Sequence, residues 1–275
     1  MWPFSKKSVV PVLRLSGPIG AVSSFRKGLA LQGVAGPIER AFTMSKLPSV
    51  AIVINSPGGS AVQSSLMFKR IRQLADENKK KVYVFCEDVA ASGGYYLAVA
   101  GDEIYADPSS IVGSIGVIFA GFGFDKALAK VGVERRVYTA GTSKNALDSF
   151  LPEVPEDIER IKAVQRDIHD VFIGVVKDRR AGKLRGPDDE LFSGLFWSAK
   201  RALDLGLIDG VSDVRTKMRQ LHGDKVVLKP VPIGGGGLLS RLRRNAPGGE
   251  QFSLVDPQEA LAAVETRALW ARYGL

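Results

Sequence analysis

The chain has 275 residues, a net charge of +9 and a hydrophobic fraction of 45%, values that describe a folded globular protein and exclude a fibrous or intrinsically disordered one. Its single cysteine, Cys86, excludes an intrachain disulfide and a cysteine-built metal site. The two histidines, His169 and His222, lie far apart in sequence and outside any metal-ligand motif. We therefore expect neither a metal ion nor a cofactor.

The positive charge is scattered, with small clusters at residues 79–81 and 241–244. No aromatic residues are interleaved with either cluster in a nucleic-acid-binding motif, so we expect no nucleic-acid partner. Peripheral contact with an anionic membrane surface stays open. Residues 9–15 form an apolar run that is too short for a membrane span or a signal-peptide core. We accordingly expect a cytoplasmic protein without a membrane anchor.

Short β-branched runs alternate with amphipathic segments in the first half of the chain. The predicted strands are residues 9–15, 49–54, 81–86, 104–106, 111–119 and 133–138. Residues 61–78 carry apolar side chains at helical spacing and predict a helix. This alternation indicates an α/β fold with a largely parallel sheet.

The second half predicts helices and a linker. Residues 155–180 form a long helix with one broad apolar face, which needs a partner surface, and residues 199–205 form a short helix. Glycine and proline with basic residues then predict a flexible linker at residues 231–255. Residues 256–275 predict a terminal amphipathic helix. The main domain therefore covers residues 1–230.

A glycine turn follows the second strand, where residues 55–60 read Asn-Ser-Pro-Gly-Gly-Ser directly before a helix. Backbone N–H groups at such a turn can face an anion, which makes the segment a candidate oxyanion hole. It matches neither the phosphate-loop nor the dinucleotide-binding pattern. A purely structural turn is the alternative interpretation.

A second glycine segment, residues 90–96, places Ser92 at the start of a helix after the third strand. The hydroxyl of Ser92 would then be exposed above the sheet, and the N–H of Gly93 could stabilise a developing negative charge. The alternative is that Ser92 caps the helix.

A nucleophilic serine needs a base, and neither histidine has a companion pattern that marks it as one. Lysine is an accepted alternative to histidine, and Lys144 follows a predicted strand within a segment of small residues. Its amine must be neutral to accept a proton, which requires a desolvated site. Read alone, a lysine in this setting is more often an ordinary surface lysine than a base.

In combination, these segments resemble the signal peptide peptidase A family of bacterial serine peptidases, whose fold is similar to that of the Clp protease and crotonase superfamily. The resemblance covers roughly residues 9–221. It rests on residues 55–60, 91–96, 113–117, 140–144, 196–202 and 205–209.

The resemblance implies that Ser92 is the acylating nucleophile, Lys144 its general base, and Ser114 the residue that orients the lysine amine. It assigns the oxyanion hole to the N–H groups of Gly59 and Gly93. The implied substrates are peptides, such as signal-peptide remnants or other short or unfolded polypeptides. Because family members form rings or domes, we expect a homo-oligomer in which neighbouring copies complete the Ser-Lys dyad.

Three other functions remain open. A crotonase-type enzyme acting on a coenzyme A thioester would share the fold but needs no nucleophilic serine. A non-catalytic scaffold would keep the fold without activity. A histidine-based, Clp-like protease would need His169 or His222 near Ser92.

Overall fold

The computed structural model describes residues 8–20, 28–141, 143–233 and 257–275. The predicted linker, residues 231–255, lies outside these ranges except for residues 231–233.

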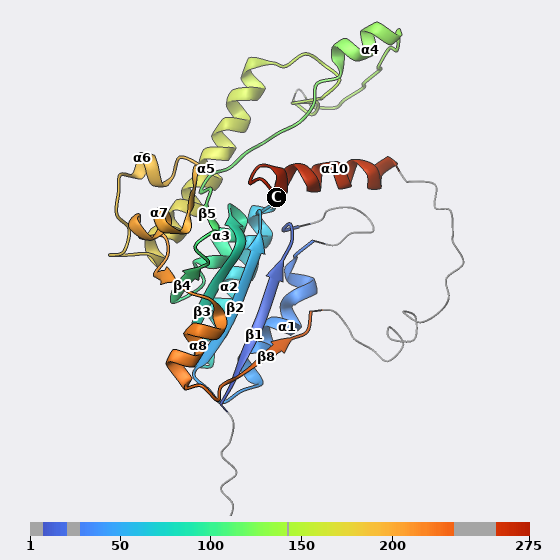
Figure 1. The fold of residues 1–275 in the computed structure, drawn as a ribbon. Coiled ribbons are helices and arrows are strands. Elements are labelled where there is room, and N and C mark those ends of the chain that lie inside the picture. Colours follow the sequence, from blue (N-terminus) through green and yellow to red (C-terminus); the bar gives the residue numbers. More distant parts are fainter. Residues whose placement is uncertain (1–7, 21–27, 142, 234–256) are drawn as a thin grey trace, which may run out of the picture.

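The core of the molecule is a predominantly parallel β-sheet (Figure 1). Its strands are β1 (Val9–Ser16), β2 (Ser49–Ser56), β3 (Lys81–Ala91), β4 (Glu103–Ala106), β5 (Ile111–Gly113), β6 (Phe196–Ser198), β7 (Gly210–Val211) and β8 (Val227–Val231). The order is β6-β5-β3-β2-β1-β8, and β4 pairs with β3 and β7. Only the β5–β6 pair is antiparallel among these strands. The predicted α/β fold with a largely parallel sheet is confirmed.

Helices cover both faces of this sheet. The helices in the described residues are α1 (Leu31–Thr43), α2 (Ala61–Glu77), α3 (Gly93–Ala98), α4 (Asp125–Val131), α5 (Pro155–Arg179), α6 (Asp188–Leu191), α7 (Ala199–Asp204), α8 (Val214–His222) and α10 (Pro257–Ala271). Along β2 the side chains alternate, so that Ile52 and Ile54 join the larger core with α1, α2 and α3. Ala51 and Val53 face the opposite side and pack in a second cluster with Met218 of α8. A sheet buried on both faces explains why β2 is apolar from residue 50 to residue 54.

Two strand predictions were wrong. Residues 133–138 form no strand, and β5 ends at Gly113 although a strand was predicted to residue 119. Both stretches are rich in β-branched residues, but residues 131–141 are all exposed and no neighbouring strand pairs with them. A strand requires the hydrogen bonds of a partner, so β propensity alone does not form one here.

A projecting arm, defined here as residues 117–154, carries α4 away from the sheet together with the first turns of α5 (Figure 1). None of the residues of α4 is buried. Helix α5 buries Phe172 and Val176 near its end, whereas Val164 is 46% exposed. Part of the broad apolar face predicted for this helix is therefore uncovered in the single chain.

Helix α10 lies across the end of the sheet at which β1, β2 and β3 terminate (Figure 1). Trp270 and Tyr273 attach this end of the chain to Val89, Ala91 and Ile111 of the sheet. Among the described helices, none combines the length and apolar character needed to cross a membrane.

Candidate active site

The predicted motifs meet at the carboxyl edge of the sheet. Strands β2, β3 and β5 run parallel as neighbours, and each is followed directly by one of the segments singled out in the sequence. Parallel neighbours end at the same edge, which is where α/β folds place their sites. The turn at residues 57–60, Ser92 and Ser114 are therefore brought together from distant parts of the chain.

Ser92 occupies a strained turn between β3 and α3, with φ 53° and ψ −122°. A non-glycine residue seldom adopts a positive φ, and such strain is characteristic of a nucleophile held on a sharp strand-to-helix turn. Although Ser92 stands at the N-cap position of α3, its side chain makes no capping hydrogen bond. Ser92 is partly exposed, and its hydroxyl does not stabilise the helix as a cap.

The glycine turn after β2 packs directly against Ser92. A Cβ atom on Gly58 would lie 2.8 Å from the Cβ of Ser92 and 2.9 Å from the amide nitrogen of Gly93. A Cβ atom on Gly59 would lie 2.1 Å from the carbonyl oxygen of Ile19. Gly58 and Gly59 also have φ values of 101° and 139°. Only glycine fits at these positions.

Two backbone amides are available beside Ser92. Within the described ranges, neither the N–H of Gly59 nor that of Gly93 has a hydrogen-bond acceptor. The two lie close together, because a Cβ atom on Gly93 would be 3.4 Å from the Gly59 nitrogen. Gly93 is buried and Gly59 is exposed. A pair of amides without acceptors beside a serine is suited to an oxyanion.

Ser114 follows β5 and is also held in a positive-φ conformation, at 54°. Its residue is 6% exposed, and its amide donates to the carbonyl of Leu195 at 2.7 Å. The preceding Gly113 accepts a 2.8 Å hydrogen bond from the amide of Ser92. The sheet therefore fixes the backbones of the two serines relative to each other.

Lys144 belongs to the segment between α4 and α5, and this segment projects away from the ends of β3 and β5 (Figure 1). Lys144 is exposed, and a turn holds its backbone, in which the amide of Lys144 donates to the carbonyl of Gly141 at 3.3 Å. On either side of this turn in the sequence, Phe124 and Phe150 stack on each other, with ring centroids 5.4 Å apart. Within one chain the structure thus does not bring Lys144 to Ser92.

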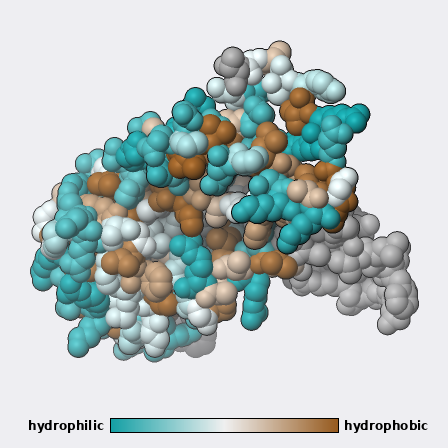
Figure 2. Space-filling view, turned by 90° about the horizontal axis from the view of Figure 1, so that it is seen from above, coloured by the Kyte–Doolittle hydropathy of each residue, from teal (hydrophilic) through white to brown (hydrophobic). Residues whose placement is uncertain are grey.

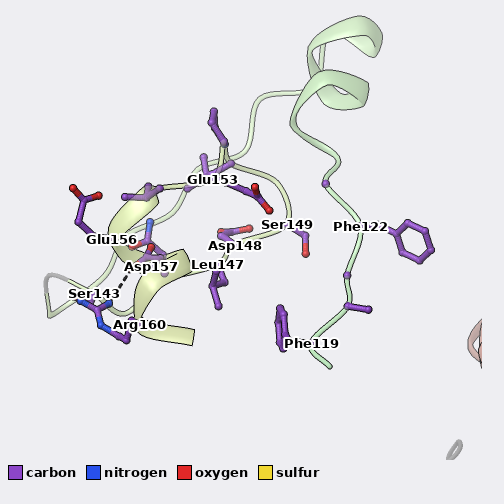
Figure 3. A pocket seen from close by; sticks show the side chains of 17 residues that line it. Phe119, Phe122, Ser143, Leu147, Asp148, Ser149, Glu153, Glu156, Asp157 and Arg160 are labelled. Carbon is purple, nitrogen blue, oxygen red and sulfur yellow. Dashed lines mark hydrogen bonds and ion pairs between the residues drawn. The ribbon is translucent and has the colours of Figure 1, made fainter. Parts of the chain in front are cut away.

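The arm contains a hollow of its own (Figure 3). Phe119, Leu147 and Asp148 line it, together with Arg160 at the start of α5. Ser143, which precedes Lys144, also lines this hollow, whereas Ser92 and Ser114 do not. The hollow belongs to the loop that carries Lys144 and is separate from the edge that holds the serines.

Other potential catalytic groups are placed unfavourably. The Nε2 atom of His222 lies 3.0 Å from the Oγ of Ser49, the first residue of β2, and so at the opposite end of the sheet from Ser92. The Nε2 atom of His169 bonds to the carbonyl of Ile115 at 3.0 Å. Burial raises the pKa of the Cys86 thiol to about 12, which keeps it protonated. No metal-binding group of histidine, cysteine or carboxylate side chains occurs among the described residues.

The comparison with protein families decides the classification. The model of peptidase family S49 matches residues 75–227, more than half of the chain. The chain belongs to peptidase family S49. The predicted relationship to signal peptide peptidase A is thereby confirmed, and the match covers β3 with Ser92, Ser114 and the whole arm.

Two curated relatives of this S49 chain are much longer proteins. The serine protease SPPA of Arabidopsis thaliana, a chloroplastic protein, is 32% identical over 72% of this chain and 32% of its own length. A protein of Brucella abortus named Na(+)/H(+) antiporter NhaA is 54% identical over 97% of this chain. The chain spans 37% of that protein's length, so the name refers to a longer protein of which only this part matches.

A solved structure shares the fold of this S49 chain. A mutant of the 1510-N membrane-bound stomatin-specific protease aligns with a TM-score of 0.51, covering 83% of this chain and 99% of the other, at 17% sequence identity. At that identity the likeness concerns the fold alone.

The sequence did not predict what two residues, Asn55 and Tyr273, contribute to the site. The side chain of Asn55 joins β2 to β3, because its Nδ2 donates to Asp88 at 2.6 Å and its Oδ1 accepts from the amide of Val89 at 3.3 Å. Tyr273, which follows α10, is buried against Ala91. The aromatic side chain of Tyr273 was the signal in the sequence that this residue could be buried. Its contacts, Val89 and Ala91, could not be predicted because they lie far from it in the sequence.

Proposed function

We propose that this chain is a serine endopeptidase that uses a Ser-Lys dyad and hydrolyses peptide bonds in signal-peptide remnants or other short or unfolded polypeptides. The observation that carries the proposal is the setting of Ser92: a strained, uncapped serine next to two amides without acceptors. Membership of family S49 and the named serine protease among the relatives support it.

In the proposed reaction, the Oγ of Ser92 attacks the carbonyl carbon of the peptide bond while its proton passes to the neutral amine of Lys144. The amides of Gly59 and Gly93 donate to the resulting oxyanion. Collapse of this intermediate breaks the C–N bond, and the ammonium of Lys144 returns the proton to the leaving amine. Water then attacks the acyl ester while Lys144 accepts its proton. The ester C–O bond breaks, the ammonium of Lys144 returns the proton to the Oγ of Ser92, and both groups are regenerated.

The base must come from another copy of the chain. The arm carries Lys144 away from Ser92 and exposes large apolar residues, among them Ile118 at 67%, Phe122 at 69% and Tyr138 at 91%. Figure 2, which views this end of the molecule from above, shows brown apolar side chains at the surface among teal polar ones. Exposed apolar groups of this extent mark an interface. A ring or dome of identical chains would cover them and desolvate Lys144 beside Ser114.

The test is covalent labelling with a fluorophosphonate, followed by intact mass. The wild type should acquire one label, and Ser92→Ala and Lys144→Ala should each acquire none. Co-assembly of these two variants should restore labelling at about a quarter of the sites, since only an interface between one intact serine and one intact lysine is competent. Absence of labelling in a folded, oligomeric wild type would contradict the proposed function.

The crotonase-type alternative uses the same fold and the same kind of amide pair. It would leave Ser92 unlabelled and would predict binding of a coenzyme A thioester. The strained, uncapped conformation of Ser92 favours the peptidase, because an enolate-stabilising enzyme has no use for it.

A further inference from the structure

The pairing of β2 with β3 is interrupted just before the candidate active site. The regular register ends at Ile54 of β2 and resumes at Ser56. Between these positions β2 has one residue, Asn55, whereas β3 has three, residues 87–89. A bulge of this kind disrupts the ladder of backbone hydrogen bonds between two strands. Side-chain bonds can therefore determine how the ends of β2 and β3 lie relative to each other.

Asn55 bridges this bulge with both ends of its side-chain amide. Its Nδ2 donates to the carboxylate of Asp88 at 2.6 Å, and its Oδ1 accepts from the amide of Val89 at 3.3 Å. Val89 is completely buried, so its amide needs an acceptor within the protein. A carboxylate accepts and an amide N–H donates, so the two partners together determine which end of the side chain faces which strand residue. Asn55 is therefore held in one orientation.

The segments that follow the bulge carry the two amides of the candidate oxyanion hole. Ser56 is completely buried, and its Oγ accepts from the amide of Gly58 at 3.2 Å, so the turn that leads to Gly59 is attached to the end of β2. The other amide, that of Gly93, follows the end of β3. The separation of the two amides therefore depends on how β2 and β3 are joined across the bulge, where Asn55 supplies the side-chain bonds.

We propose that Asn55 is a positioning residue for the oxyanion hole and that Asp88 orients it. The inference rests on the proposed function and adds to it a residue that acts on the reaction through the backbone, without touching the substrate. By joining the two strands, Asn55 keeps the amides of Gly59 and Gly93 close enough to donate to one oxygen atom. That oxygen carries its full negative charge only after attack, so displacement of one amide slows the chemical step and leaves binding nearly unchanged.

The experiment measures the rate of fluorophosphonate labelling of Ser92 in the full chain as a function of probe concentration. Asn55→Asp places a carboxylate against that of Asp88, and the repulsion should lower the maximal rate constant by about tenfold. The half-saturating probe concentration should stay within about twofold of wild type. Asp88→Asn should label nearly like the wild type, because its side-chain oxygen still accepts from Asn55. The double variant should recover to within about twofold of wild type, since the introduced amide donates to the introduced carboxylate.

Glu87→Gln is the matched control. Glu87 lies in the same bulge but forms an ion pair with Arg14 of β1, so the substitution removes a charge without touching the bonds of Asn55. An exposed ion pair contributes little, and this variant should label at the wild-type rate. Asn55→Ala removes the bridge without introducing a charge and should be slowed as much as Asn55→Asp. Urea unfolding of each variant identifies any loss of labelling that follows from loss of the fold.

A second measurement needs no catalysis and uses the full chain carrying Ser92→Ala. Hydrogen exchange of residues 57–60 should be faster with Asn55→Asp or Asn55→Ala and should return to the parent rate when Asn55→Asp is combined with Asp88→Asn. Failure of the proposed function gives a different pattern, because the wild type would then stay unlabelled while exchange still follows these substitutions. A labelled wild type whose labelling and exchange do not respond to substitution of Asn55, or a double variant no faster than Asn55→Asp, would overturn the inference.

Discussion

The amide of Ser92 donates a 2.8 Å hydrogen bond to the carbonyl of Gly113. This bond joins the residue that follows β3 to the residue that ends β5, and Ser114 comes immediately after the latter. Both serines have φ values above 50°. A side-chain substitution at either serine therefore leaves the backbone connection intact, so that functional effects can be separated from folding.

Gly59→Ala should abolish most activity. The added Cβ would lie 2.1 Å from the carbonyl oxygen of Ile19, so the turn must shift and its amide with it. Loss of one oxyanion donor lowers kcat by about 10²–10³-fold. The measurement is the rate of fluorophosphonate labelling. Gly33→Ala in α1, where a Cβ meets nothing within 4 Å, is the control and should label at the wild-type rate. Similar losses in both variants would contradict the role of Gly59.

Ser114→Ala should slow labelling of Ser92 by about tenfold, the effect of one lost hydrogen bond to a charged or reacting group. If Ser114 positions the lysine amine, the pH at which labelling is half-maximal should also change, which a structural role would not produce. Ser110→Ala removes another buried hydroxyl, whose Oγ donates to the carbonyl of Cys86 at 3.1 Å. This control should preserve the pH profile. An unchanged profile in Ser114→Ala would exclude the positioning role.

Substitution of either histidine by alanine should leave labelling within about twofold of wild type. His222 bonds to Ser49 at the far end of β2, and burial lowers its pKa, so it stays neutral near pH 7. His169 contacts the Ile115 carbonyl, so His169→Ala should cost about 1 kcal/mol of unfolding free energy. Labelling and urea unfolding measure the two effects. Loss of labelling without loss of stability would revive the histidine-based alternative.

Asp209→Asn should destabilise the fold by about 2 kcal/mol at pH 7. Burial raises the pKa of Asp209, but hydrogen bonds from Arg180 and Lys183 outweigh burial and leave that pKa below its usual value. Arg180 is 1% exposed and would lose its carboxylate partner. Because the folded-state pKa is depressed, the stabilisation is present above the unfolded-state pKa of about 3.9 and is lost as pH falls through the folded-state value.

The measurement for Asp209 is the unfolding temperature of both proteins between pH 7 and pH 3. The gap between wild type and Asp209→Asn should narrow below about pH 4. Asp189→Asn, at an exposed position, should unfold like the wild type across the range. A gap that is constant with pH would show that the charge of Asp209 does not contribute.

Tyr138→Asp should dissociate the proposed oligomer. The side chain is 91% exposed in the single chain, and a charge placed in a covered apolar interface is costly. Analytical ultracentrifugation should show a smaller species, and labelling of Ser92 should fall in parallel because the base is lost. Lys126→Ala, on the same arm in α4, should do neither. An intact assembly with normal labelling in Tyr138→Asp would exclude this part of the arm from the interface.

Local patterns in the sequence determined much of the fold and one half of the candidate site. The apolar run of β2, the glycine turn after it and the Ser-Gly-Gly start of α3 depend on neighbours within a few residues, so the strand, the turn and Ser92 could be predicted together. Residues 155–180 were predicted as a helix for the same reason, and α5 spans Pro155–Arg179. The strand predicted for residues 133–138 was wrong, because a strand depends on a partner strand that the local sequence does not show.

Only the tertiary structure decided which distant groups meet. It placed Ser92 against Gly58 and Gly113, packed Tyr273 against Ala91, and held Lys144 on an exposed arm. Asp209 likewise finds Arg180 across the fold. Such contacts arise from the packing of the whole chain against one sheet, and residue spacing along the sequence carries no information about them. The sequence determined the chemical groups of this protein, and packing decided which of them can act together.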